Sequence, residues 1–266
     1  MTTLPASGYH VGKILARRVA SPTVVVLDLE VPSSLQFQPG QWLDFVVPPY
    51  EWVGGFSTAS QPEELPKITL AIKESNHPPS RWVHSQESTE IGRTVHVQVG
   101  GTCVLDTTTR QKIETQPVVF CAGGIGISPV LSMYRQWTQL LQKSNNQNPP
   151  PSSFLYSVST EEELVFGDEL VQTLLLAHNT NSSHKNRHSL CFSLTQQTAW
   201  KDSSKQDLES KGVQCRTGRF MKEFLTEADD TSAFYLCGPP AMLDEGVDLL
   251  RKRGIADTNI HFERWW

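Results

Sequence analysis

The chain has 266 residues, which is long enough for two compact domains that each bury a core. Its formal net charge of −5 comes from well-mixed basic and acidic residues, so there is no electrostatic footprint for nucleic acid or for an anionic membrane. No apolar run approaches the roughly 18 residues of a membrane-spanning helix, and five widely spaced cysteines without a C-x-x-C pair argue against a disulfide framework or a zinc site.

The first part of the chain predicts short strands separated by proline and glycine. It is basic near its start, with Lys13, Arg17 and Arg18, as in a mitochondrial transit peptide, but its β-rich pattern favours strands of the fold. Any transit peptide would then lie upstream, and we expect an intracellular protein of the mitochondrial matrix or the cytoplasm. Strands at this spacing indicate a small barrel or sandwich, with one short helix at 79–86. The expected strands are VGKILARRV, TVVVLDLEV, QWLDFVV, ITLAIK and TVHVQV.

Beyond a polar stretch at 107–116, the expected linker, apolar strands alternate with longer helical stretches. We expect the domains to be 1–110 and 111–266. The alternation predicts a parallel sheet with helices on both faces. Two polar segments, 144–153 and 196–211, are expected to be surface loops. The expected strands are PVVFCAG, FLYSVS, SLCFSLT, AFYLCG and NIHFERW.

The segment CAGGIGISP at 121–129 follows an apolar strand and precedes an amphipathic helix. Its glycines let the backbone turn sharply and come close to a ligand. The free N–H groups and the positive dipole end of the new helix favour phosphate oxygens. The segment therefore predicts a pyrophosphate site, and a tight turn without a ligand is the alternative.

The segment YLCGPPAM at 235–242 carries a second signal. A strand ends at Cys237, a Gly-Pro turn follows, and Pro240 begins a helix, where its missing N–H costs nothing. Ligands of open α/β sheets bind at the carboxyl ends of the strands, so we expect Cys237 and the loop 123–128 to face the same crevice. A small buried core residue is the alternative for Cys237.

Other chemistries lack their sequence signatures. The chain has no H-E-x-x-H, no G-x-S-x-G and no G-x-x-x-x-G-K-[ST], which excludes the zinc-protease, serine-hydrolase and P-loop patterns. His184 and His188 lie four residues apart in a polar segment, where a solvated loop is favoured over a metal pair. We expect no metal site.

A β-rich half with PGQ and FSTAS is followed, in this order, by AGGIGISP, CGPPAM and a terminal Glu-x-aromatic. In these segments the chain resembles the ferredoxin-NADP reductase-like superfamily. The resemblance covers nearly the whole chain and extends to the branch of oxidoreductase NAD-binding domain-containing proteins. It implies an N-terminal antiparallel flavin-binding-type β-barrel followed by a Rossmann-like parallel-sheet nucleotide-binding domain. It also implies that a hydride passes from NADH or NADPH to a bound flavin, and that electrons then pass to an unidentified acceptor.

The same resemblance implies which residues bind the dinucleotide and act on it. Cys237 and Glu263 would flank the nicotinamide, which makes them candidate catalytic residues. The residues that would bind NAD(H) are Gly123, Gly124, Ile125, Gly126, Ile127, Ser128, Gly238 and Pro239.

For the flavin, the resemblance points to residues of the barrel and of the C-terminus. Phe56 would stack on the flavin ring, and Ser57 would donate a hydrogen bond near its reactive nitrogen, as a third candidate catalytic residue. Thr58 and Ser80 would complete the FAD site. Trp265 would cover the flavin ring, or would tie down the last strand instead.

Departures from the family pattern weaken the flavin assignment. Gly54 stands where the family has an arginine on the flavin phosphate, so a bidentate charge clamp is missing. Ser80 follows HPP rather than glycines, and the segment 100–103 reads GGTC. An arginine at position 54 would tighten flavin binding where the backbone accepts a side chain. The alternative function is an NAD(H)-binding sensor or interaction module that has lost its flavin.

The end of the second strand of the expected parallel sheet bears on the choice of dinucleotide. The segment SVSTEE at 157–162 is expected to lie beside the adenosine ribose. Basic side chains there favour NADPH, and no lysine or arginine occurs at 154–183. Glu161 and Glu162 would repel a 2′-phosphate, so the sequence predicts NADH.

Overall fold

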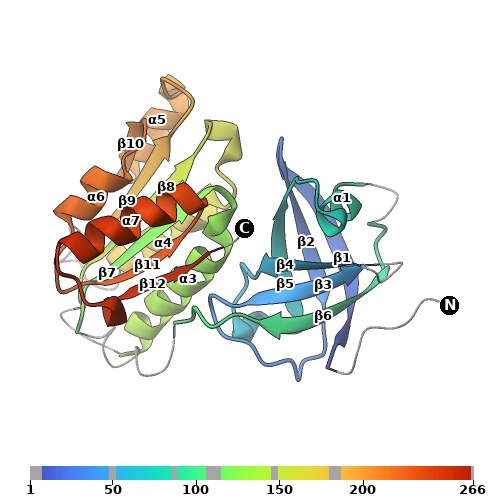
Figure 1. The fold of residues 1–266 in the computed structure, drawn as a ribbon. Helices are drawn as coiled ribbons and strands as arrows, with labels where there is room; N and C mark the ends of the chain where they lie inside the picture. Colours follow the sequence, from blue (N-terminus) through green and yellow to red (C-terminus); the bar gives the residue numbers. More distant parts are fainter. Residues whose placement is uncertain are drawn as a thin grey trace. The chain divides into compact units, whose positions relative to one another are not determined.

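The computed structural model describes residues 8–47, 52–85, 89–105, 115–144, 149–179 and 187–264. Contacts divide the chain into two units, residues 1–104 and 105–266. The expected end of the first domain at residue 110 falls outside the described residues. Each unit has a six-stranded sheet of its own (Figure 1). None of the described helices is long and apolar enough to cross a membrane.

The sheet of the first unit is antiparallel throughout and has the strand order β4-β3-β6-β1-β2-β5. A bridge between Thr58 and Leu70 joins the end of β4 to β5, which brings the two edges of the sheet together as in a barrel. The antiparallel barrel expected for this half of the chain is confirmed. Its strands are β1 His10–Ser21, β2 Val24–Glu30, β3 Trp42–Val47, β4 Trp52–Ser57, β5 Lys67–Lys73 and β6 Thr94–Gly100.

Alternating burial explains how these residues form a barrel. In β2, Leu27 and Leu29 are fully buried, whereas Asp28 and Glu30 between and after them are more exposed. The basic segment near the N-terminus is strand β1, as expected from its β-rich pattern. The short helix expected at 79–86 is α1 (Pro78–His84), and a 3-10 turn, η1, covers Pro62–Glu64.

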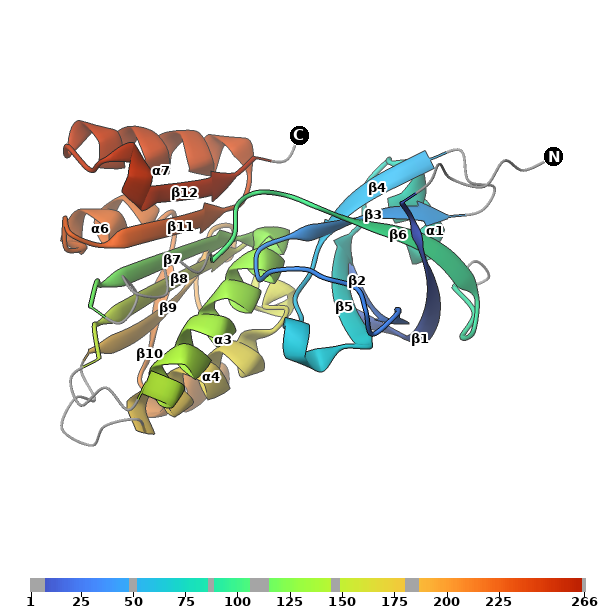
Figure 2. The ribbon, with the colours of Figure 1, turned by 90° about the horizontal axis from the view of Figure 1, so that it is seen from below.

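The sheet of the second unit is parallel throughout, in the order β10-β9-β8-β7-β11-β12. Helices α3 and α4 cover one face and helices α6 and α7 cover the other, as Figure 2 shows. The expected Rossmann-like parallel sheet is confirmed. Its strands are β7 Val118–Gly123, β8 Ser152–Val158, β9 His188–Leu194, β10 Val213–Thr217, β11 Ala233–Cys237 and β12 Ile260–Glu263. The helices are α3 Ile127–Ser144, α4 Gly167–Asn179, α5 Asp202–Ser210, α6 Met221–Glu227 and α7 Pro240–Lys252, with 3-10 turns η2 Gly124–Gly126, η3 Glu161–Glu163 and η4 Asp257–Asn259.

Both faces of the parallel sheet are packed, which explains why β7 is buried along its whole length. On the face covered by α3, the ring of Phe120 stacks on Phe154 and Tyr235, with centroids 5.7 and 5.4 Å away. On the opposite face, Cys121 and Leu236 lie in a hydrophobic cluster with residues of α6 and α7. The packed sheet therefore holds the residues at its carboxyl edge in fixed positions.

The second unit differs from expectation in the polar segment 196–211, which contains helix α5 rather than a continuous loop and leads into strand β10. Helix α5 has no buried residue, so the sequence has no apolar periodicity that could reveal it. Ion pairs at i,i+4 on the surface support the helix instead. These pairs are Lys205 with Glu209 and Lys211 with Asp207.

His188 also differs from expectation. It begins β9 and is only 5% exposed, so the expectation of a solvated loop is wrong for this residue. Its Nδ1 lies 2.9 Å from Oγ of Ser152, which begins the neighbouring strand β8, and its ring contacts Trp137 edge-on. The polar residues before His188 hide the start of the strand in the sequence.

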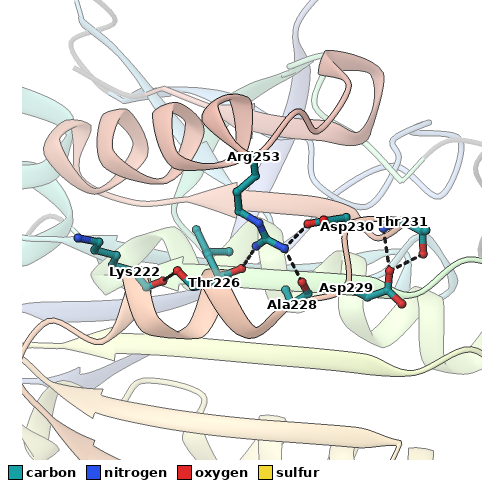
Figure 3. A network of polar contacts seen from close by, with 8 residues as sticks. Lys222, Thr226, Ala228, Asp229, Asp230, Thr231 and Arg253 are labelled. Carbon is teal, nitrogen blue, oxygen red and sulfur yellow. Dashed lines mark hydrogen bonds and ion pairs between the residues drawn. The ribbon is translucent and has the colours of Figure 1, made fainter.

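A polar network near the amino edge of the sheet fixes the end of α6 and the turn before β11 (Figure 3). Arg253, just after α7, donates to the carbonyl oxygens of Leu225 and Ala228 at the end of α6. Asp229 accepts hydrogen bonds from the backbone and the hydroxyl of Thr231. The last carbonyl groups of a helix have no partner within it, so the guanidinium supplies donors that α6 lacks.

Candidate functional site

The glycine loop lies at the carboxyl end of β7, which ends at Gly123, and α3 begins at Ile127. Gly124 starts the turn between them with a φ of 53°, in the left-handed region that favours glycine. A Cβ added at Gly124 would meet no atom within 4 Å, so the backbone is bare where a side chain would project. Ile127 is fully buried and Ile125 is half-buried. The loop therefore offers a ligand chiefly its backbone.

The other two glycines of the loop pack against the turn after β11. A Cβ at Gly126 would lie 2.8 Å from the backbone nitrogen of Gly238 and closer still to the carbonyl oxygen of Cys237. A Cβ at Gly123 would lie 2.8 Å from Cδ of Pro239. The two glycine-containing segments thus meet at one edge of the sheet, backbone against backbone.

Ser128 lies in the first turn of α3 and has an unpartnered polar group. Only 1% of its surface is exposed, and its Oγ has no hydrogen-bond partner among the described residues. Such buried groups are rare in native proteins. Helix α3 has 18 residues, so its N-terminus carries the positive end of a long helix dipole. The unpartnered hydroxyl and the helix dipole together favour a phosphate group, whose oxygens accept hydrogen bonds.

Cys237 and Glu263 are neighbours in the sheet. Cys237, the last residue of β11, pairs with Ala122 of β7 on one side and with Glu263, the last residue of β12, on the other. Neighbouring strands lie about 4.8 Å apart, so the two residues end their strands side by side. Cys237 is 2% exposed and Glu263 is half-buried. Strand order therefore brings the glycine loop, Cys237 and Glu263 together, while Trp265 lies outside the described residues.

Three other cysteines of the second unit are not reactive thiols. Burial raises the pKa of the fully buried Cys121 and raises the pKa of Cys191 to about 12. Burial also raises the pKa of Cys215 to about 11. All three stay protonated near neutral pH, and the thiolate is the reactive form. Of the cysteines of this unit, Cys237 is the one that lies at the candidate site.

The carboxyl ends of β8 and β9 carry a polar pair, of which the sequence singles out Glu161 but not Gln197. Glu161, just after β8, shares hydrogen bonds with Gln197, just after β9. Gln197 lies in a polar segment without periodicity, and only the order of the strands shows that the two residues are neighbours.

In the first unit, the ring of Phe56 fills the space beside Gly54. Both residues belong to β4 and point to the same face. A Cβ at Gly54 would lie 2.8 Å from Cζ of Phe56 and 2.9 Å from Cβ of Pro79 in α1. The Phe56 ring also packs edge-on against Phe45 of the core, with centroids 5.8 Å apart. The backbone at position 54 therefore does not accept an arginine without displacing its neighbours.

The other barrel residues expected at the flavin differ in what they can offer. Ser57 ends β4, is half-buried and makes no side-chain hydrogen bond within the described residues. Thr58 is fully buried, and its hydroxyl donates to the carbonyl oxygen of Gln41 at 3.0 Å. The hydroxyl of Ser80 donates to the carbonyl oxygen of Lys73 at 2.8 Å. Of these three hydroxyl groups, the one on Ser57 is available to a ligand.

The residues present do not fit the phosphate groups of FAD. Helix α1 opens with Pro78 and Pro79, which have no N–H to donate, and the N–H of Arg81 is bonded to the carbonyl oxygen of His77. The hydrogen of the Ser80 hydroxyl is already donated, and the glycine on β4 supplies no charge. Among the described residues, β4 therefore places no cation beside the glycine, and the first turn of α1 offers few free donors to a diphosphate.

Comparisons with known proteins agree with this architecture. Residues 120–247 match the family described as oxidoreductase NAD-binding domain. The chain is 33% identical over 259 residues to oxidoreductase NAD-binding domain-containing protein 1 of Danio rerio, which covers 92% of this chain and 88% of that protein.

Solved structures show the same fold. The ferredoxin reductase in carbazole 1,9a-dioxygenase matches with a TM-score of 0.73 at 18% identity, over 97% of this chain and 70% of that one. A ferredoxin NADP+ reductase from Neisseria gonorrhoeae, with bound FAD and NADP, matches with a TM-score of 0.71 at 18% identity, over 97% and 99% of the two chains. These likenesses support the two-unit fold of barrel and parallel sheet.

Proposed function

Because the chain belongs to the family of oxidoreductase NAD-binding domain-containing protein 1 and is an NAD(P)H-dependent oxidoreductase, we propose that it takes electrons from NADH bound at the carboxyl edge of its parallel sheet. The observation that carries this proposal is the bare backbone at Gly124 near the buried, unpartnered hydroxyl of Ser128. In the proposal, the backbone of residues 123–128 binds the pyrophosphate at the positive end of α3. In the proposal, Gly238 and Pro239, which pack on this loop, lie between the pyrophosphate and the nicotinamide.

In this proposal, Cys237 and Glu263 flank the nicotinamide. The ring gains positive charge as it gives up a hydride, and a carboxylate beside it stabilises that charge. The small side chain of Cys237 lets the ring approach the edge of the sheet. Glu263→Gln is expected to slow hydride transfer by about 10-fold or more while NADH affinity changes little. Single-turnover oxidation of NADH, measured beside its binding constant, separates the two effects.

Phe56 and Ser57 are the residues that would lie at the ring of a bound flavin, which would supply a first acceptor for the electrons of NADH. When bound, a flavin accepts a hydride and divides the electron pair for a further acceptor. Because the barrel does not fit FAD phosphates, we propose that the flavin is held loosely. A hydrogen bond to a charged group is worth about 1.5–3 kcal/mol, so losing the clamp lowers affinity roughly 10- to 150-fold.

The second candidate function is an NAD(H)-binding sensor or interaction module that holds no flavin. The observation that favours it is the packing of Phe56 and Pro79 around Gly54, which fills the space of a phosphate clamp with apolar groups.

Binding titrations separate the two candidate functions. The purified protein is examined for flavin absorbance near ~450 nm, and is then titrated with NADH and with FAD, FMN and riboflavin. The reductase proposal expects NADH to bind, and expects the three flavins to bind with similar affinity because their phosphates are not used. Binding of NADH without any flavin supports the second candidate. Failure to bind NADH contradicts both.

A further inference from the structure

The side chain of Met242 packs against both glycine-containing segments of the candidate site. Met242 is the third residue of α7, and its backbone N–H donates to the carbonyl oxygen of Pro239 at 2.9 Å, which fixes the start of the side chain. A Cβ added at Gly238 would lie 2.9 Å from Sδ of Met242, and a Cβ added at Gly123 would overlap the same sulfur. The thioether therefore lies against the end of β7 and the turn after β11 together.

The two glycines that Met242 contacts also pack against each other. A Cβ at Gly238 would lie 3.1 Å from the α-carbon and from the nitrogen of Gly123. Met242 also packs against the hydrophobic cluster that contains Leu236 and Leu243. A flexible thioether fills an irregular gap of this kind well. Met242 therefore supports the place where the two segments proposed to bind the dinucleotide meet.

Met242 is also the most accessible of the three methionines that the structure describes. Met133 in α3 and Met221 in α6 are 2% and 5% exposed, whereas Met242 is half-buried. The residues just before it, 239–241, are exposed. An oxidant in solution therefore reaches the sulfur of Met242 more readily than the sulfurs of the two buried methionines.

We propose that Met242 is an oxidation site that controls dinucleotide binding: hydrogen peroxide converts its thioether to the sulfoxide, and the modified side chain lowers the affinity for NADH. In this step the O–O bond of the peroxide breaks and one oxygen bonds to the sulfur, which loses two electrons. The other oxygen leaves as water with both protons of the peroxide. This inference rests on the proposed function, because it takes NADH to bind at the glycine loop.

The sulfoxide does not fit where the thioether lies. The glycines leave no room for a further atom on their side of the sulfur, since a carbon added at Gly123 would already overlap it. On the side of the hydrophobic cluster, the new polar oxygen would meet apolar side chains, and burying an unpaired polar group is costly. The oxidised side chain therefore turns toward water, and Gly123 and Gly238 lose the group that supports them.

The test treats three forms of the full chain with hydrogen peroxide: the native protein, M242L and the control M221L. Dithiothreitol then returns reversibly oxidised thiols to the reduced form and leaves sulfoxides in place. Peptide mass spectrometry measures the sulfoxide at each methionine, and calorimetry gives the dissociation constant of NADH before and after treatment. Each protein is compared with its own untreated sample, so any effect of the substitution itself cancels.

We expect the native protein and M221L to form the sulfoxide at Met242 and to lose NADH affinity by about 5-fold or more, and M242L to lose less than about 2-fold. Methionine sulfoxide reductases are expected to restore the affinity of the oxidised native protein. Melting curves are expected to show that the treated proteins remain folded.

A native protein that carries the sulfoxide at Met242 and binds NADH as before overturns the inference, and so does one that stays unoxidised there. An equal loss of affinity in M242L also overturns it and points to a cysteine, with Cys237 at the site as the first candidate. Loss of affinity through unfolding of the whole protein overturns it as well. These results leave the proposed function intact because the untreated protein binds NADH, whereas an untreated protein that does not bind NADH overturns both.

Discussion

Gly126 lies with its α-carbon against the backbone carbonyl of Cys237, so closely that a single added carbon would overlap the oxygen. Two residues earlier, Gly124 has open space on the side where its side chain would be. The two glycines of one loop therefore serve different purposes. Gly126 lets two strand ends meet, and Gly124 leaves room for a ligand.

Gly124→Ala is expected to weaken NADH binding by at least about 10-fold, while its positive φ costs about 1–2 kcal/mol of stability. Gly254→Ala is the matched control, because Gly254 also has a positive φ and open space but lies at the end of α7. This control is expected to lose similar stability and keep its NADH affinity. Gly126→Ala is expected to lower the melting temperature further. Native NADH affinity in Gly124→Ala would remove the loop from the site.

Gly54→Arg is expected to destabilise the barrel by about 1–3 kcal/mol, as overpacking does, and not to tighten flavin binding. Chemical denaturation and flavin titration measure the two effects. Phe56→Ala in the Gly54→Arg background removes the crowding ring, so the double variant is expected to be more stable than the sum of the single changes. Additive losses would show that Phe56 does not cause the crowding.

Arg253→Met is expected to lower stability by about 1–3 kcal/mol, because it leaves carbonyl groups at the end of α6 without donors and breaks the ion pair with Asp230. For a chain of this size, each kcal/mol lowers the melting temperature by roughly 2–4 °C. Arg251→Met is the control, since Arg251 forms an ion pair with Asp257 whose two side chains are exposed, and such pairs contribute little to stability. Equal losses in the two variants would contradict the capping role of Arg253.

Hydrogen bonds from the backbone and the hydroxyl of Thr231 hold the pKa of Asp229 below its ordinary value of 3.8. A carboxyl group with a lowered pKa stabilises the fold when ionised, so its contribution is present above pH 3.8 and is lost as the pH falls through the lowered pKa. Asp229→Ala is therefore expected to lower the melting temperature at neutral pH, with a difference from the native protein that shrinks in acid. Glu162→Ala is the control and is expected to show no such trend. A constant difference across the pH range would contradict the assignment.

Features within one stretch of sequence could be predicted from the residues themselves, whereas features that depend on strand order needed the family resemblance, as for Cys237 and Glu263, or the structure. The glycine loop is local, because its strand, glycines and helix follow one another. The pairing of Cys237 with Glu263 and of Glu161 with Gln197 depends on which strands are neighbours, and apolar periodicity does not encode this order. The crowding at Gly54 likewise involves a helix that comes later in the chain.

Cys237 and Glu263 are strand residues rather than loop residues, and they are joined by the hydrogen-bond ladder of a parallel sheet. The distance between their α-carbons is set by the spacing of paired strands, which neither loop motion nor ligand binding changes by much. The pair is thus preorganised before any ligand arrives. Substitution of either side chain would change the chemistry of the pair, whereas the positions of the two α-carbons would stay the same.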